Sequence, residues 1–172
     1  MNYEQIKAVA DKVVTALLPY CERCEIAGSV RRKKSDCKDI EVCIVPRGRD
    51  LPELARVVRG WDRVKGDIKG RYTQRRLPEG VVLDLFIATR DNWGLIYAIR
   101  TGSAEFSHNV LARGWRKRGY TSQGGVLYPY TREAKGESVV DILDFSNPLY
   151  IREEQELFEF IGIPFVEPEA RL

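Results

Sequence analysis

The sequence predicts an α+β protein of two lobes, with a mixed β-sheet and helices up to about residue 90 and a smaller α+β lobe over 91–172. Two segments rich in alternating or β-branched apolar residues, 39–45 and 81–89, are typical of strands. The segment 3–19 carries apolar residues at helical spacing, which indicates an amphipathic helix beside them. After Asp91 the pattern changes to helical segments and a Gly-Gly turn, and this change marks the second lobe.

The first lobe begins with the helix over 3–19, in which Ile6, Val9, Val13 and Leu17 share one face. The next elements, in chain order, are a short strand over 24–29, a helical turn or loop over 29–35, a strand over 39–45 closed by Pro46, a helix over 51–61, a hairpin over 66–80 and a strand over 81–89. This order of strands and helices predicts a sheet that is covered by helices.

The second lobe should hold two helices, 91–100 and 105–118, separated by a Thr-Gly-Ser turn. A hairpin over 120–131 follows, with its turn at Gly124-Gly125. A last helix, 152–162, starts in acidic residues and stops at glycine, as the helix dipole and C-cap preferences favour. Asp141 and Asp144 are three apart, so they do not share a strand face, and we expect structural or capping roles for them.

The composition describes a folded chain, because 44% of its 172 residues are hydrophobic and 31% are charged. No apolar run approaches the roughly 20 residues that a membrane span needs, and the N-terminus lacks a signal-peptide pattern. We therefore expect an intracellular protein, cytoplasmic or associated with the nucleoid. Residues 1–150 hold 26 basic and 19 acidic residues, a net charge of +7, which favours a polyanionic partner such as nucleic acid or a nucleotide.

The four cysteines do not form a recognisable metal site. Cys21 and Cys24 have zinc-ligand spacing, but no second pair follows and His108 is the only histidine in the chain. We interpret all four as reduced thiols, with a disulfide as the less common alternative for an intracellular protein.

Three carboxylates suggest a cation site. Residues two apart in a strand point to the same face, so Asp39 and Glu41 project together while their apolar neighbours enter the core. Asp84 lies in the centre of the other apolar strand, and if the strands are neighbours all three acids converge. Such charges repel unless they are solvated or bridged, and Mg²⁺ is the cation that prefers carboxylates together with substrate phosphates. Two Mg²⁺ ions could then support an in-line phosphoryl displacement; a solvated strand edge is the alternative.

Gly28-Ser29 and the basic segment Arg31-Arg32-Lys33-Lys34 supply features that suit phosphate binding. A strand that ends in Gly-Ser lets backbone N–H groups and a hydroxyl approach phosphate oxygens. The basic side chains can neutralise a triphosphate, with arginine preferred where the contact is bidentate. Each feature is common alone, and their combination with the three carboxylates favours a nucleotide site.

These motifs together resemble the nucleotidyltransferase superfamily and, within it, the family X DNA polymerases, which are similar to DNA polymerase beta. "GSVRRKKSDCKDIEVCIV" resembles the metal-binding motif of that family's palm, and "VVLDLFIATRDNWGLIYAIRTGS" resembles its third carboxylate, a helix and a Thr-Gly-Ser turn. "RGYTSQGGVLYP" and "EEQELFEFIGIPFVEPEAR" resemble its nucleotide-side subdomain and C-terminal ending. The resemblance covers about residues 24–171 and implies a palm over 1–90 and a thumb-like subdomain over 91–172.

The resemblance also implies roles for individual residues. Asp39, Glu41 and Asp84 would ligate two Mg²⁺ ions, with Mn²⁺ as a substitute, and would catalyse addition of a dNTP to a primer 3′-hydroxyl. The nucleotide-binding residues would be Gly28, Ser29, Arg32 and Lys38 at the phosphates, Thr101, Gly102 and Ser103 beside the sugar, and Ser107 near the base. The partner would be a primer-template or gapped DNA duplex, the use short-gap filling in repair, and the active form a monomer.

This sequence departs from the family at three points. Glu41 stands where the family has aspartate, and Ile99-Arg100 stand where many members have aromatic residues that select the sugar. We expect no counterpart of the family's lyase and helix-hairpin-helix domains, so DNA phosphates would be contacted by the chain's own basic residues Lys69, Arg71, Arg75, Arg76, Arg113, Arg116, Lys117 and Arg118. The alternatives are that these residues are merely solvated, that the acceptor is a small-molecule or protein hydroxyl, or that the chain is a non-catalytic nucleic-acid-binding module.

Overall fold

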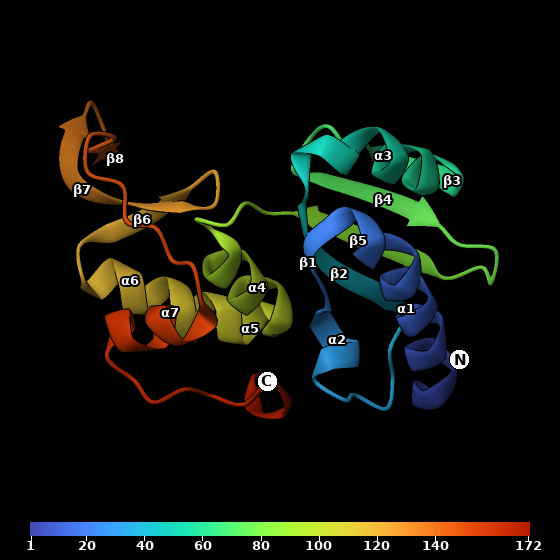
Figure 1. Ribbon diagram of the computed structural model, residues 1–172. Helices are drawn as coiled ribbons and strands as arrows, with labels where there is room; N and C mark the ends of the chain where they lie inside the picture. The colour runs from blue at the N-terminus through green and yellow to red at the C-terminus, as the bar shows by residue number, and fades with distance from the viewer.

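The computed structural model describes residues 1–172 as two lobes that lie side by side (Figure 1). The larger lobe runs from α1 to β5, and an extended segment then crosses to α4 and the smaller lobe. The chain ends back at the junction, where its C-terminus lies close to α5 (Figure 1). The α+β class is confirmed.

The larger lobe contains a mixed five-stranded sheet in the order β1-β2-β5-β4-β3. Its strands are β1 Cys21–Ile26, β2 Asp39–Pro46, β3 Asp62–Gly66, β4 Tyr72–Arg76 and β5 Val82–Ile87. The central strands β2 and β5 are parallel, while the other neighbouring pairs are antiparallel. The two strongest strand patterns in the sequence therefore form adjacent strands at the middle of the sheet.

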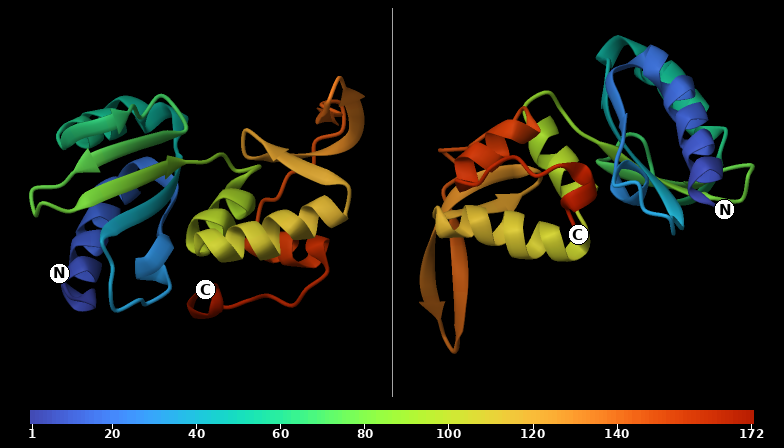
Figure 2. Two further views of the ribbon diagram at one scale, coloured as in Figure 1. Left: turned by 180° about the vertical axis from the view of Figure 1, so that it is seen from behind. Right: turned by 90° about the horizontal axis from the view of Figure 1, so that it is seen from below.

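Helices cover one face of this sheet. α1 (Tyr3–Leu17) begins with a capping box between Asn2 and Gln5, and α3 (Leu51–Arg59) begins with a proline in its first turn. The apolar faces of both helices pack on the alternate residues of β2 and β5, such as Ile40 and Leu83, which are completely buried. Figure 2 shows these helices on the outer side of the sheet, away from the smaller lobe. The opposite face of the sheet is thus left for the polar residues of the same strands.

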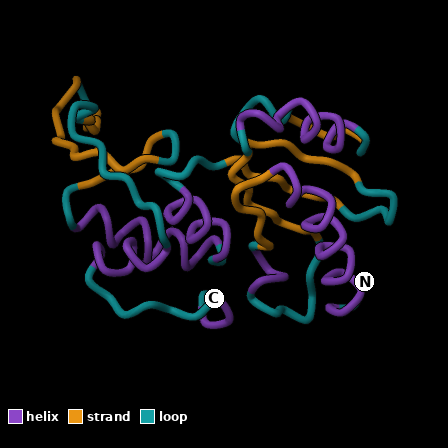
Figure 3. The backbone as a smooth tube through the Cα atoms, in the orientation of Figure 1, coloured by secondary structure: helices purple, strands orange, loops and turns teal.

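The smaller lobe packs its helices against one another and against a three-stranded sheet (Figure 3). Its elements are α4 Trp93–Thr101, α5 Ala104–Phe106, a wider π-helical stretch Ser107–Ala112, α6 Arg113–Lys117, the strands β6 Tyr120–Gln123, β7 Val126–Lys135 and β8 Ser138–Leu143, and α7 Glu154–Ile161. Trp115 is buried in its core. Gly162 adopts φ 78°, which ends α7 in the left-handed conformation that glycine tolerates.

Two strands were not recognised in the sequence. The hairpin expected over 66–80 is formed by β3 and β4, so its first strand lies earlier, and β8 had no expected counterpart. β3 is almost entirely exposed and lacks the apolar alternation that reveals a half-buried strand, while the apolar residues of β8 come in adjacent pairs and do not alternate. The four cysteines are buried free thiols, which confirms their interpretation. None of the helices combines the length and apolarity that crossing a membrane would require.

A buried ion network joins the two lobes. Arg31, in the short helix α2 (Gly28–Arg31), donates to both carboxylate oxygens of Glu154 at 2.9 and 2.7 Å. Arg171, which is completely buried near the C-terminus, donates to the same carboxylate at 2.5 Å. The Glu154 carboxylate offsets one of the two positive charges, and its oxygens accept hydrogen bonds from both guanidinium groups. The network fixes α2 and the C-terminal residues against the start of α7.

We expect Glu154→Ala to lower the free energy of unfolding by roughly 3–5 kcal/mol, because it leaves the buried Arg171 and the half-buried Arg31 without their shared partner. Chemical denaturation of purified protein measures this loss. Glu159→Ala, on the exposed face of the same helix, is the matched control and should change stability by about 0.5 kcal/mol or less. Equal stabilities for the two variants would contradict the network's role.

Candidate active site

The parallel pairing of β2 with β5 places three carboxylates on one face of the sheet. Glu41 lies directly opposite Asp84 in the register, and Asp39 lies two residues earlier on β2 with its side chain on the same face. All three side chains are partly exposed, whereas the intervening Ile40 is completely buried on the other face. The adjacency of the two strands, on which the cation-site hypothesis depended, is therefore present.

The smaller lobe covers only part of this face. Trp93 and Tyr97 of α4 pack against Cys43 and Phe86, which lie further along β2 and β5. The start of β2, which carries Asp39, is not covered by this cluster. The acidic patch therefore lies at the edge of the contact between the lobes, where a ligand can reach it.

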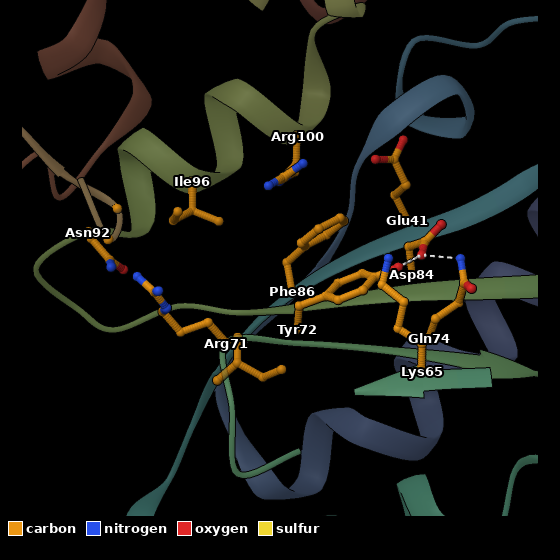
Figure 4. Close-up of a pocket in the computed structure, with 13 residues that line it drawn as sticks. Glu41, Lys65, Arg71, Tyr72, Gln74, Asp84, Phe86, Asn92, Ile96 and Arg100 are labelled. Carbon is orange, nitrogen blue, oxygen red and sulfur yellow. Dashed lines mark hydrogen bonds between the residues drawn. The ribbon is translucent and has the colours of Figure 1, made fainter. Parts of the chain in front are cut away.

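The three carboxylates do not converge on one point. Asp84 accepts hydrogen bonds on Oδ1 from the Tyr72 hydroxyl and, at 2.8 Å, from Nε2 of Gln74. Glu41 leaves the sheet in a different direction and packs against Gly28 (Figure 4). No group of three or more His, Cys, Asp or Glu side chains is arranged to hold a metal ion. The acids share a face and a register, but their side chains would have to turn to share one ligand.

Gly28 is required by its conformation and by Glu41. It adopts φ +60°, and a Cβ at this position would lie 1.7 Å from Oε2 of Glu41. Only a residue without a side chain permits both the left-handed turn and this close approach of the carboxylate. The Gly-Ser pair singled out in the sequence therefore contacts the acidic patch directly.

Crowding shifts the protonation of two of the acids. Burial, followed by the charges of Asp39 and Asp84, raises the pKa of Glu41 to about 7. Burial and the charge of Asp84 also raise the pKa of Asp39. Arg100 and Arg32 oppose the shift of Glu41, but they do not cancel it. The patch thus holds more negative charge than its own surroundings stabilise.

Ser29 and Arg32 are candidate phosphate ligands with unused donors. The Ser29 hydroxyl and Nε of Arg32 are buried and have no hydrogen-bond partner, while Nη1 of Arg32 donates to the carbonyl of Thr101 at 2.6 Å. Lys38 is exposed and precedes Asp39 in the chain. Ser29 and Arg32 therefore place unpaired donors on the short segment that also carries Gly28, and Lys38 adds positive charge just before β2.

The Thr-Gly-Ser segment forms a turn between α4 and α5, as predicted. Thr101 is completely buried and accepts from Arg31 and Arg32 of the larger lobe. Gly102 caps α4, and Ser103 caps α5 by accepting from the backbone N–H of Phe106. The Ser107 hydroxyl donates to the carbonyl of Ile99 and contacts Gly102. In this structure these residues brace the junction, and the turn lies next to the basic segment.

Comparisons with known proteins gave no relative. Neither the family models nor the curated proteins that were searched match this chain. The fold and the arrangement of side chains are therefore the observations on which a function can be argued.

A cavity of about 660 Å³ lies beside Asp84 and Glu41, between the sheet and the smaller lobe (Figure 4). Sequence reasoning missed several residues that line it: Lys65, Tyr72, Gln74, Phe86, Asn92, Ile96 and Arg100. Gly124 and Gly125, predicted as a hairpin turn, close it from the smaller lobe. Tyr72 and Gln74 could have been found from their i, i+2 spacing, had their strand been placed next to the Asp84 strand.

Two of the residues expected to contact DNA have internal roles instead. Arg75 is 2% exposed, because β4 points it towards the core side, where it donates to Thr73 and lies 3.9 Å from Asp67. Arg116 pairs with Asp141 at 2.9 Å and lies over the ring of Tyr130. Arg75 is therefore too buried in this structure to offer a surface contact, and Arg116 is already engaged. The other six are exposed and make no ion pair: Lys69, Arg71, Arg76, Arg113, Lys117 and Arg118.

We expect Glu41→Gln to stabilise the metal-free protein above pH 7. The folded-state pKa of about 7 exceeds the ordinary value of 4.5, so the unfolded chain loses this proton first. Stability is therefore lost as pH rises from 4.5 to 7, and the variant should avoid a cost on the order of 1–3 kcal/mol. Urea unfolding with a chelator present, at pH 4.5 and pH 8, measures the difference, which should appear at pH 8 alone. A variant that is less stable than wild type at pH 8 would contradict the electrostatic strain.

Proposed function

We propose that this protein is a nucleotidyltransferase of the family X DNA polymerase kind, which adds deoxynucleoside triphosphates to a primer 3′-hydroxyl and releases pyrophosphate. The observation that carries the proposal is the register of β2 and β5, which puts Glu41 opposite Asp84 with Asp39 on the same face. Ser29 and Arg32, with buried unpaired donors, support it from the adjacent segment. The order of these motifs along the chain is the order of the family that the sequence resembles.

The donor set fits Mg²⁺ in kind. Three carboxylates on one face supply the hard oxygen ligands that Mg²⁺ prefers. Burial, followed by the charges of neighbouring acids, raises the pKa of Asp39 and Glu41, and a bound cation would favour their charged forms. We infer that Asp39, Glu41 and Asp84 hold two Mg²⁺ ions, with Mn²⁺ as a substitute. When bound, these ions would activate the attacking hydroxyl and neutralise charge on the transferred phosphoryl group.

The chain's own residues then position the nucleotide. The Ser29 hydroxyl and the Arg32 guanidinium would donate to the β- and γ-phosphates, because both have donors that no protein group uses. Lys38 would add charge at the entrance of the same segment. The Thr101–Ser103 turn, held by Arg32, would border the sugar. Phosphoryl transfer depends mainly on such positioning and charge neutralisation.

The exposed basic residues favour DNA as the acceptor. Lys69 and Arg71 follow β3 on the larger lobe, and Arg71 also lines the cavity. Arg113, Lys117 and Arg118 lie on or directly after α6 of the smaller lobe. Cations on both lobes suit a duplex end that lies across the junction, as short-gap filling by a monomer would require.

The cavity supports a second candidate, transfer of a nucleotide to a small-molecule hydroxyl. Its volume of about 660 Å³ is within the range of small-ligand sites, and Gly124-Gly125 closes one side. Glu41, where DNA polymerases of this family have aspartate, is compatible with such an enzyme. The free cations on both lobes favour DNA over this alternative.

We expect Asp39→Ala and Asp84→Ala each to lower Mg²⁺-dependent primer extension by about a hundredfold or more, because each removes a ligand for the ions that stabilise the transition state. Extension of a labelled primer in a gapped duplex measures the rate. Asp36→Ala, on the neighbouring exposed loop, is the control and should retain activity. Wild-type rates in both test variants would refute the proposal, and nucleotide transfer without DNA would favour the small-molecule acceptor.

We expect the double variant Lys69→Ala/Arg71→Ala to weaken duplex binding and to reduce its salt dependence. Each lost phosphate contact lowers the slope of log K against log salt by about 0.9, so the double variant should lose roughly 2. Fluorescence anisotropy over a series of salt concentrations measures this slope. Arg56→Ala, exposed on α3 over the other face of the sheet, should leave the slope unchanged. An unaltered slope in the double variant would exclude these two residues from the interface.

A further inference from the structure

Two side chains of β4 hold Asp84 from the side opposite Glu41. In the antiparallel register of β4 and β5, Gln74 lies directly opposite Asp84, and Tyr72 lies two residues away on the same face. Nε2 of Gln74 and the hydroxyl of Tyr72 both donate to Oδ1 of Asp84. Glu41, Asp84 and Gln74 therefore form a row across three neighbouring strands.

This arrangement treats the two oxygens of Asp84 differently. Oδ1 receives both hydrogen bonds, and Oδ2 receives none. Hydrogen bonds to a charged acceptor are stronger than those between neutral groups, so the two donors fix the orientation of the carboxylate. Asp84 thus keeps one free oxygen in a defined position.

Tyr72 is itself held in place by its neighbours. Its ring packs on that of Phe86 with centroids 5.2 Å apart, and the Lys65 ammonium lies 5.2 Å from the Tyr72 ring centre. The Arg100 guanidinium lies over the ring of Phe86 at 4.1 Å. Two aromatic rings between two cations form a wall of the cavity (Figure 4). A donor in such a wall does not turn freely, and its hydrogen bond to Asp84 is directed by the packing.

Glu41 and Asp39 have no comparable support. No side chain donates a hydrogen bond to either carboxylate, and Glu41 rests against Gly28 instead. Of the three acids, Asp84 alone is oriented by other side chains. The two β4 donors also draw Asp84 towards β4 and away from the like charge of Glu41 on β2.

We propose that Tyr72 and Gln74 are positioning residues, which orient Asp84 so that its free oxygen is presented to the divalent cation. This inference rests on the proposed function, because it concerns the same cation site. The role requires no contact between either residue and the substrate. It follows that their loss should weaken cation binding and the chemical step, and should leave nucleotide affinity nearly unchanged.

The test compares Tyr72→Phe, Gln74→Met and the double variant with wild type. These substitutions nearly keep the packing volume and remove the groups that donate to Asp84. Mn²⁺ binding, measured by electron paramagnetic resonance in the absence of DNA and nucleotide, should weaken by about 10–100-fold in the double variant, the usual effect of losing groups that orient metal ligands. In primer extension, kcat should fall while KM for the dNTP stays within about twofold, because Ser29 and Arg32 are intact.

Tyr128→Phe is the control, because the Tyr128 hydroxyl makes no hydrogen bond and the residue lies in the smaller lobe. It should bind Mn²⁺ like wild type. Wild-type Mn²⁺ affinity in the double variant, when Asp84→Ala has lost binding, would overturn the positioning role and leave the proposed function standing. Wild-type Mn²⁺ affinity in Asp39→Ala and Asp84→Ala would instead overturn the cation site, and both proposals with it. If the double variant fails to fold, Tyr72→Phe alone decides, with a several-fold loss of Mn²⁺ affinity expected.

Discussion

Glu41 and Asp84 lie opposite each other on neighbouring parallel strands. Most features of the site follow from the repulsion between these like charges. The strands must turn their apolar residues to α1 and α3, so the acids are forced onto the other face together. Each acid is then accommodated separately. Asp84 is held by Tyr72 and Gln74, whereas Glu41 lies against Gly28 with a pKa raised to about 7. A cation between them would relieve a repulsion that the protein alone only reduces.

In the basic segment after Gly28, one arginine stabilises the contact between the lobes and its neighbour keeps an unpaired donor. Arg31 is committed to Glu154 and Thr101 and so joins the lobes, while Arg32 uses one nitrogen on Thr101 and keeps Nε free. The segment from Gly28 to Arg32 therefore contacts the smaller lobe and also holds donors that no protein group uses. A substitution at Arg31 would be expected to disturb the candidate site through the lobe contact, because Arg31 makes three hydrogen bonds to Glu154 and Thr101 of the smaller lobe.

The sequence allowed the central strands and the acidic face to be predicted, because β2 and β5 are buried on one side and their alternation is strong. The edge strands β3 and β8 gave no such signal, because β3 is almost entirely exposed and the apolar residues of β8 do not alternate. Because β3 was not recognised, the register of β4 could not be predicted. The alternation along β4 that buries Arg75 and exposes Arg76 was therefore missed. The unknown register also hid Tyr72 and Gln74, whose importance lies in a pairing between strands and not in any local pattern. The partner of Arg116, Asp141, lies 25 residues away and was equally inaccessible.

Glu41 is one of the points at which this chain departs from the family it resembles, and the structure gives this departure a local context. An aspartate at this position would be one methylene shorter and would not reach as far into the space that a Cβ of residue 28 would fill. The longer acid uses that space, so the glycine and the glutamate form a matched pair. Because Gly28 also begins the segment that carries Ser29 and Arg32, movement of Glu41 towards a cation would free space beside the phosphate donors. In the proposed enzyme, cation binding and nucleotide binding would thereby be connected through one glycine.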